Sequence, residues 1–203
     1  MTAQISDEVL WAGKSYSLIG TSGAELFNPE DFGMVPVMIH TACYRGFYAT
    51  YTISEGFLYL RNLTIKDQND HYPDIGGVTP IHRADEPVEE KITTCAKTGT
   101  VFHSFDYYPG VTEYRNLSYR VPFTGEIRIA KDFIQKEYVH MGFPKASAFK
   151  TVLDIKLDAG KVIDIQDRSQ EAKQIRGSFK KRYKDEHGAH IILETFNTDM
   201  EWK

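Results

Sequence analysis

The fold of this 203-residue chain is decided by residues 47–65, FYATYTISEGFLYLRNLTI. Aromatic and β-branched residues dominate both halves of this stretch, and such residues favour a pleated, half-buried strand. Ser54-Glu55-Gly56 separates the halves, and a three-residue loop ending in glycine is typical of a type I turn closed by a G1 bulge. The stretch therefore predicts a β-hairpin whose register pairs Ile53 with Phe57.

Residues 151–165 follow the same pattern, with Asp158-Ala159-Gly160 as the loop. The predicted register places Ile155 opposite Ile163 and gathers the apolar residues on one buried face. The break at Gly13 predicts a further hairpin within residues 9–20.

Residues 169–187 predict the one long helix of the chain. Four apolar residues recur there at helical spacing, which would form a single apolar stripe, and Gly188 follows in the usual C-terminal position. Residues 189–196 favour a final strand. The stripe consists of Ala172, Ile175, Phe179 and Tyr183.

The predicted fold class is therefore α+β. Antiparallel β-hairpins form one or two sheets, and the long C-terminal helix packs on one face. The length fits a single domain over residues 1–203. Any internal division is expected within the polar segment 66–99, which is rich in Asp, Glu, Pro and Gly.

Composition points to a cytoplasmic protein. The N-terminal residues are polar and acidic, unlike a secretory signal peptide, and no stretch approaches the ~18 apolar residues of a membrane span. There are two cysteines and no CxxC pair, which is unlike a secreted disulfide scaffold. We expect neither a membrane partner nor a disulfide framework.

The predicted helix carries a basic face, although the net charge of the chain is −4. The overall acidity argues against nucleic acid as a partner, because phosphate binding calls for a basic surplus. The helix face would nevertheless suit an RNA-binding module at residues 169–187, although a solvated face balanced by neighbouring carboxylates explains the same pattern. Its cations include Lys173, Arg176, Lys180 and Lys184.

Tyrosines concentrate beside the turn at residues 105–110. Asp106, Tyr107 and Tyr108 lie in this segment, and Tyr114 follows closely. Tyrosine is enriched at binding hot spots because a large apolar ring carries a polar tip. The segment predicts a protein-binding surface, with packing of the rings on the sheet as the alternative.

Catalytic and metal-binding signatures are missing from the sequence. No GxSxG elbow is present, and no histidine pair has HxxxH or HExxH spacing. We therefore predict neither a metal site nor a cofactor. If a pocket exists between sheet and helix, its candidate polar groups are Arg45, His103, Asp106 and His140.

Residues 45–60, RGFYATYTISEGFLYL, resemble a hairpin of an uncharacterised family of bacterial proteins. Residues 122–133, PFTGEIRIAKDF, are similar to a second block of that family. The resemblance implies no particular chemical activity for this chain. Because some such proteins sit near polymorphic toxin genes, it implies a toxin-neutralising immunity protein.

The leading expectation is thus a non-catalytic cytosolic binding protein with another protein as its partner. A small enzyme or small-ligand-binding domain with a pocket between sheet and helix is the first alternative. The RNA-binding module is the second.

Overall fold

A computed structural model describes residues 2–23, 25–82, 90–94, 101–105, 110–185 and 189–200, with side chains placed outside 90–94, 101–105, 180 and 189–192. Ten strands form one large sheet, in the order β12-β11-β10-β2-β1-β3-β4-β8-β5, with β9 pairing β4. Strands β6 and β7 form a two-stranded sheet of their own. The strands are β1 (Glu8–Trp11), β2 (Lys14–Thr21), β3 (Phe47–Ser54), β4 (Phe57–Ile65), β5 (Ile81–His82), β6 (Glu90–Thr94), β7 (Val101–Phe105), β8 (Thr112–Tyr114), β9 (Tyr119–Arg120), β10 (Gly125–Phe133), β11 (Phe149–Asp158) and β12 (Lys161–Asp167).

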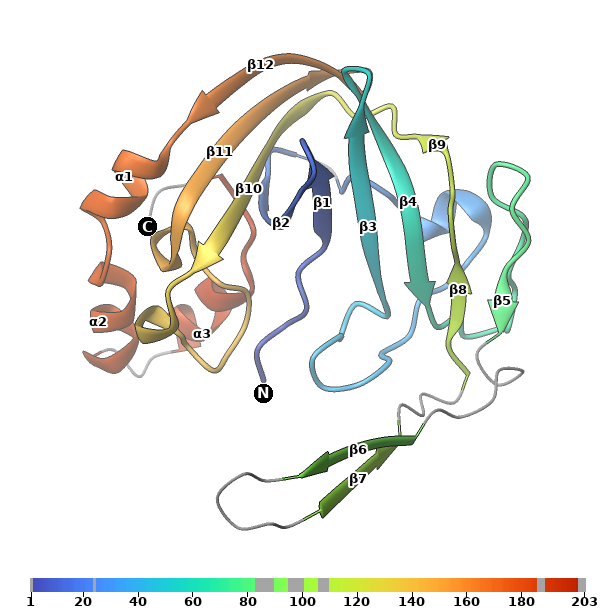
Figure 1. The fold of residues 1–203 in the computed structure, drawn as a ribbon, viewed down its shortest axis with the longest axis horizontal. Coiled ribbons are helices and arrows are strands. Elements are labelled where there is room, and N and C mark those ends of the chain that lie inside the picture. Colours follow the sequence, from blue (N-terminus) through green and yellow to red (C-terminus); the bar gives the residue numbers. More distant parts are fainter. Residues whose placement is uncertain are drawn as a thin grey trace.

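The described helices are short. Three are α-helices and three are single 3₁₀ turns, and the α-helices gather beside the ends of β10 and β11 (Figure 1). They are η1 (Pro29–Phe32), η3 (Gln135–Glu137), η4 (Ala146–Ala148), α1 (Ser169–Gln174), α2 (Ser178–Asp185) and α3 (Ala189–Phe196).

The large sheet bends into an arch (Figure 1). Its strands run antiparallel except β1 and β3, which pair in parallel, so the sheet is mixed. At the top of the arch the tips of the β3–β4 and β11–β12 hairpins touch, where Lys161 pairs with Phe57. The Val162 N–H donates to Gly56 O there at 2.8 Å, and the Leu58 N–H donates to Gly160 O at 2.8 Å. The sheet is thereby nearly closed at one end.

The three predicted hairpins exist, but the turns at Gly56 and Gly160 differ from the expected type. Ala12-Gly13, Glu55-Gly56 and Ala159-Gly160 each hold two successive residues at positive φ. That is the signature of a two-residue type I′ turn, whose twist matches that of the flanking strands better than a type I turn does. In the β3–β4 hairpin Ser54 therefore pairs with Phe57, and the predicted pairing of Ile53 with Phe57 is wrong.

The predicted pairing of Ile155 with Ile163 in the β11–β12 hairpin is wrong, because Ile155 pairs with Ile165. Ile155 is fully buried, whereas Ile163 is 52% exposed. The tight turn pairs Leu157 with Val162, and the register then shifts between Lys156 and Leu157. Val162 consequently packs against the core in place of Ile163.

The prediction of an α+β fold with a long C-terminal helix is wrong. A large mixed sheet dominates the described chain, and residues 169–185 form two short helices, α1 and α2. Gly177 separates them at φ +85°, a left-handed conformation that a continuous helix excludes. Ala172 and Phe179 do face inward, as the apolar stripe predicted. Residues 189–196, predicted as a strand, form α3.

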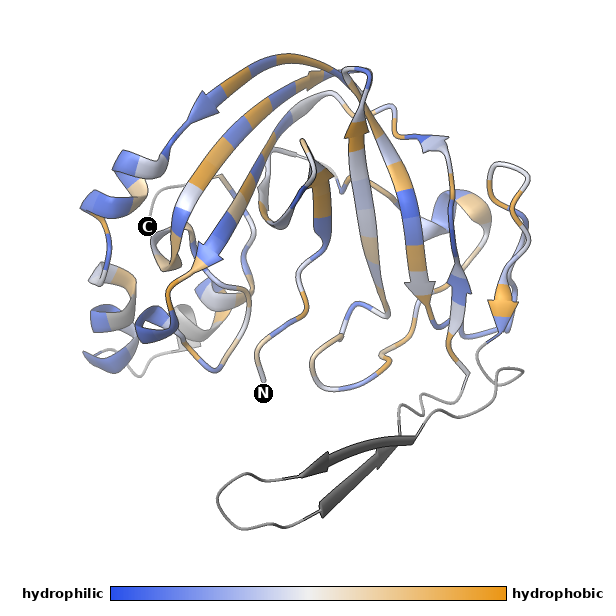
Figure 2. Cartoon of the chain, viewed as in Figure 1, coloured by the Kyte–Doolittle hydropathy of each residue, from blue (hydrophilic) through white to orange (hydrophobic). Residues whose placement is uncertain are grey.

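Hydrophobic and hydrophilic residues alternate along β4, β11 and β12 (Figure 2). The larger core cluster combines residues of the arch with the 26–34 loop, including Tyr51, Ile129 and Ile155. A smaller cluster, which includes Val152 and Ala172, packs α1 on β11. These cores leave one end of the arch to be filled by loops and chain termini.

Candidate functional site

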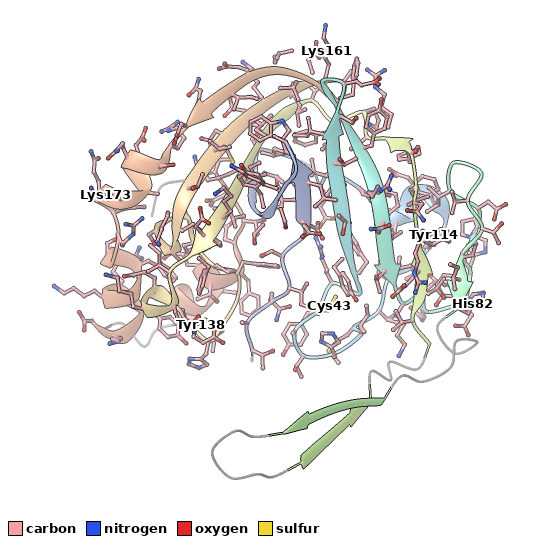
Figure 3. The ribbon with its side chains drawn as sticks, in the orientation of Figure 1. Cys43, His82, Tyr114, Tyr138, Lys161 and Lys173 are labelled. Atoms are coloured by element: carbon pink, nitrogen blue, oxygen red, sulfur yellow. The ribbon has the colours of Figure 1, made fainter. Side chains whose placement is uncertain are left out.

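A cavity of about 270 Å³ lies among β2, β3, the N-terminal segment and the end of α3. The loop before β3, which carries Cys43, lies at the open end of the arch, opposite the hairpin tip at Lys161 (Figure 3). The wall is mostly apolar, with a few charged and polar groups. The lining residues are Gln4, Ile5, Asp7, Leu18, Gly20, Thr21, Glu25, Leu26, Phe27, Cys43, Tyr44, Arg45, Phe47, Tyr51, Phe143, Phe196 and Thr198.

Arg45 is the cation of this cavity. Its Nε donates to Phe47 O at 2.8 Å, its Nη2 donates to the Asp7 carboxylate, and its Cζ lies 4.4 Å from the Phe47 ring centroid. These contacts hold the guanidinium plane in one orientation. Nη1 has no hydrogen-bond partner among the described residues, and 31% of the side chain is exposed. Arg45 therefore presents oriented N–H donors to a ligand.

The Arg45 guanidinium keeps its charge despite partial burial. Burial lowers its pKa, but the negative charge and hydrogen bond of Asp7 outweigh burial, so the pKa lies above the ordinary value. A permanently charged, planar donor in a mostly apolar wall is suited to a carboxylate or a similar oxygen anion.

Tyr51 is the second donor of the cavity. It comes from the middle of β3, and only 1% of its surface is exposed. Its hydroxyl makes no hydrogen bond to a described residue, and no fully buried polar side-chain atom of the described chain lacks a partner, so this hydroxyl is accessible from the cavity that the residue lines. Burial, with Asp7 nearby, raises the pKa of Tyr51 well above its usual range. The hydroxyl thus stays protonated and can donate.

Asp7 and Glu25 are the acidic groups of the lining, and their circumstances differ. Asp7 is buried and already occupied, because it accepts from Arg45 and from the Ala49 N–H at 2.7 Å. Glu25 is exposed and has neither an ion pair nor a hydrogen bond within the described parts of the chain. Its charge nevertheless reaches Arg45 and Tyr51, since it contributes to raising the pKa of both.

Cys43 and Gln4 build the wall of the cavity. The Cys43 thiol donates to Phe47 O at 3.3 Å, and burial raises its pKa, so it is a poor nucleophile at neutral pH. Gln4 Nε2 donates to Thr41 O at 3.0 Å, and Gln4 Oε1 accepts from the Tyr44 N–H at 3.2 Å. These bonds fix the 41–45 loop against the N-terminal segment.

The structure brings together few of the predicted site residues. Of the four candidate pocket groups, only Arg45 is seen in the cavity. His140 lies elsewhere, with its ring 6.0 Å from that of Tyr183. The side chain of His103 lies outside the described residues. Asp106, Tyr107 and Tyr108 lie outside them entirely.

Tyr114 is not part of an exposed tyrosine surface. Tyr114 has no exposed surface, and its hydroxyl donates to Pro73 O at 2.8 Å. It therefore packs in the core, as the alternative interpretation had it, and cannot contact a partner from there.

The predicted basic helix face is divided. Arg176 braces the fold instead of facing outward, because it donates to Ser147 O at 3.2 Å and to Phe149 O at 2.8 Å. Lys173 on α1 and Lys184 on α2 are exposed, and the side chain of Lys180 lies outside the described set (Figure 3). The break at Gly177 further separates these cations.

Sequence reasoning missed Asp7, Glu25 and Tyr51 as members of one site. They are far apart in the chain, and no spacing pattern links them. The only local signal was Tyr51 at an inward position of a predicted strand, where a phenol ring looks like any apolar residue.

Neither a metal site nor a membrane-spanning helix is found in the described parts of the chain. The described side chains contain no group of three or more His, Cys, Asp or Glu placed to hold a metal ion. Where the chain is described, no helix has both the length and the apolar character needed to span a membrane.

No protein-family model matches this chain, and no curated protein or solved structure matches it either. The geometry of the cavity is therefore the main indication of function.

Proposed function

We propose that this protein binds a small organic molecule in the cavity at the open end of the arch. The ligand presents an oxygen anion, such as a carboxylate, to Arg45 and Tyr51, and its apolar body packs among the aromatic side chains of the wall. The observation that carries the proposal is that two donors line one cavity, the Arg45 guanidinium oriented by Asp7 and Phe47 O, and the Tyr51 hydroxyl, which makes no hydrogen bond to a described residue.

The polar groups support binding over catalysis. The Cys43 thiol and the Tyr51 hydroxyl both have raised pKa values, so neither is ionised near neutral pH. Arg45 is a fixed cation, and the lining contains no histidine. None of these groups is poised to move a proton at neutral pH. Asp7 is held by two donors and keeps Arg45 in place.

Isothermal titration at pH 7 with a panel of small carboxylates tests the proposal. The panel holds benzoate, 3-phenylpropionate, isovalerate, leucine and phenylalanine, with inorganic phosphate as a non-organic anion. We expect at least one organic carboxylate to bind and Tyr51→Phe to weaken it about 10- to 150-fold, the effect of one hydrogen bond to a charged group. Arg45→Lys should weaken it further, because lysine lacks the planar fork.

Tyr114→Phe is the matched control, since it removes a buried tyrosine hydroxyl of the same core outside the cavity. It should leave ligand affinity unchanged. If no carboxylate of the panel binds wild type more tightly than Tyr51→Phe, the proposal is wrong.

The other functions stay predictions. A toxin-neutralising surface at Tyr107 and Tyr108 would lie outside the described residues. The divided basic face adds no support for the RNA-binding interpretation.

A further inference from the structure

Given that the cavity binds a small ligand as proposed above, we infer that this ligand is a zwitterion, a free α-amino acid with an apolar side chain. Its carboxylate meets Arg45 and Tyr51, and its ammonium group meets the Glu25 carboxylate. The inference comes from the charges of the lining, the partners that they lack, and the size and chemistry of the wall.

The charge balance of the lining favours a ligand that also carries an amine. The charged side chains of the cavity are Asp7, Glu25 and Arg45, two acids against one base. A ligand with only a carboxylate would add a second uncompensated negative charge to a partly desolvated site, which is costly. An ammonium group on the same ligand offsets that charge and pairs with Glu25.

The unpartnered groups of the cavity are of two kinds. Arg45 Nη1 and the Tyr51 hydroxyl are donors that lack an acceptor, whereas the Glu25 carboxylate is an acceptor that lacks a donor within the described chain. A simple amine would satisfy Glu25 and leave the buried Tyr51 hydroxyl unmatched. A simple acid would do the reverse. A zwitterion satisfies both kinds, and specificity of this sort follows from the cost of leaving buried polar groups unpaired.

The size of the cavity sets the size of the side chain. A volume of about 270 Å³ corresponds to roughly nine water molecules at ~30 Å³ each, and thus to a ligand with on the order of ten non-hydrogen atoms. Leucine and phenylalanine are of this size. Apolar residues from five segments of the chain surround the space and would hold such a side chain. They are Leu18, Leu26, Phe27, Phe47, Phe143 and Phe196.

Three compounds that share one side chain test the inference, with the full chain titrated at pH 7. Phenylalanine has both charged groups, 3-phenylpropionate lacks the amine, and phenethylamine lacks the carboxylate. We expect phenylalanine to bind at least 10-fold more tightly than either truncated compound. Leucine and its counterparts isovalerate and isoamylamine serve as a second series if the larger ring does not fit.

Variants at Glu25 separate the inference from the function on which it rests. Glu25→Gln should weaken the amino acid at least 5-fold and leave 3-phenylpropionate unaffected or slightly stronger. Glu30→Gln, at an exposed acid on the nearby η1 and outside the cavity, is the matched control and should change neither.

The possible failures are distinguishable. If the acid binds as tightly as the amino acid, and Tyr51→Phe matters while Glu25→Gln does not, the ligand is a simple carboxylate. The inference is then overturned and the proposed function survives. If the amine alone binds, and Tyr51→Phe has no effect, both are overturned.

Discussion

Tyr51 and Tyr114 are buried tyrosines of one core, but their hydroxyls meet different surroundings. Tyr114 donates to a backbone carbonyl, whereas the Tyr51 hydroxyl faces the cavity without a partner in the described chain. A hydroxyl that opens on a cavity without an acceptor in the chain can donate to water or to a ligand there. At the scale of single residues, this contrast is the strongest indication of function.

The contrast predicts that the two Tyr→Phe variants differ in their free energy of unfolding. Tyr51→Phe should leave the free energy of unfolding unchanged within about 0.5 kcal/mol, because no intramolecular hydrogen bond is lost. Tyr114→Phe should cost about 1–2 kcal/mol, because Pro73 O loses its donor in the interior. Urea denaturation of the unliganded proteins measures both. A large loss for Tyr51→Phe would mean that its hydroxyl is bonded in the free protein.

At the scale of elements, the 67–72 loop is fastened by one carboxylate. Asp67 Oδ1 accepts from the Asn69 N–H at 2.8 Å and from the His71 N–H at 3.0 Å, and Oδ2 accepts from the Val35 N–H. Burial raises the pKa of Asp67, but these backbone hydrogen bonds outweigh burial and hold the pKa below its ordinary value. The loop after β4 is thereby tied to the segment that follows η1.

A depressed pKa means that this fastening stabilises the fold above the pKa of the unfolded chain and is lost as pH falls through the folded value. Asp67→Asn should therefore cost about 1–3 kcal/mol at pH 7. Its difference from wild type should shrink below about pH 4. Denaturation at several pH values measures the trend. Asp70→Asn, an exposed change in the same loop, should match wild type throughout. A pH-independent difference would show that lost packing, and not the charge, explains the cost.

Strand β12 lies at one end of the strand order and illustrates how an edge is protected. The Ile165 N–H is taken by the Asp164 side chain at 2.9 Å, and Asp164 also accepts from Gln166 at 2.9 Å. Charged groups that occupy edge N–H donors discourage pairing with another chain. The exposed Ile163 on this strand therefore reflects the local register, and nothing in its surroundings indicates a partner.

The register predicts unequal roles for two isoleucines that the sequence alone places together. Ile155→Ala should cost about 2–5 kcal/mol, because it opens a cavity in the core. Ile163→Ala should cost less than about 1 kcal/mol, since its side chain is already half in water. Chemical denaturation compares them directly, and equal costs would contradict the observed register.

At the scale of the whole molecule, two hairpin tips close the arch. Gly160 lies at φ +79°, and an added Cβ would meet Val121 O at 2.2 Å. Gly56 lies at φ +77°, and an added Cβ would meet nothing within 4 Å. The two turns thus share a backbone conformation, but only Gly160 lies in close contact with another segment, at Val121.

This pair isolates the close contact between Gly160 and the segment that joins β9 to β10. Gly56→Ala should cost about 1 kcal/mol from its left-handed backbone alone. Gly160→Ala should cost about 2–4 kcal/mol, because the same strain is joined by a clash with a backbone oxygen. The thermal unfolding midpoint should fall correspondingly further for Gly160→Ala. Equal shifts in the two variants would indicate that Gly160 is not packed against Val121 O in solution.

The sequence by itself determined the local elements that depend on neighbouring residues. Alternation and glycine placement located the hairpins at Gly13, Gly56 and Gly160, because a type I′ turn and its flanking strands are specified within a few residues. Helical spacing also found the inward positions of Ala172 and Phe179. It could not foresee the break at Gly177, since one glycine within a helical pattern costs only ~1 kcal/mol and packing decides the outcome.

Only the tertiary structure decided the mixed sheet, its near-closure and the cavity. Parallel pairing of β1 with β3 joins residues about forty positions apart, and no local preference encodes such a pairing. The cavity is likewise assembled from Asp7, Glu25, Arg45 and Tyr51 on separate segments. Each of these residues looks ordinary in the sequence. Their shared environment, a mostly apolar wall with donors and an acceptor that make no hydrogen bond to the described chain, exists only once the chain has folded around it.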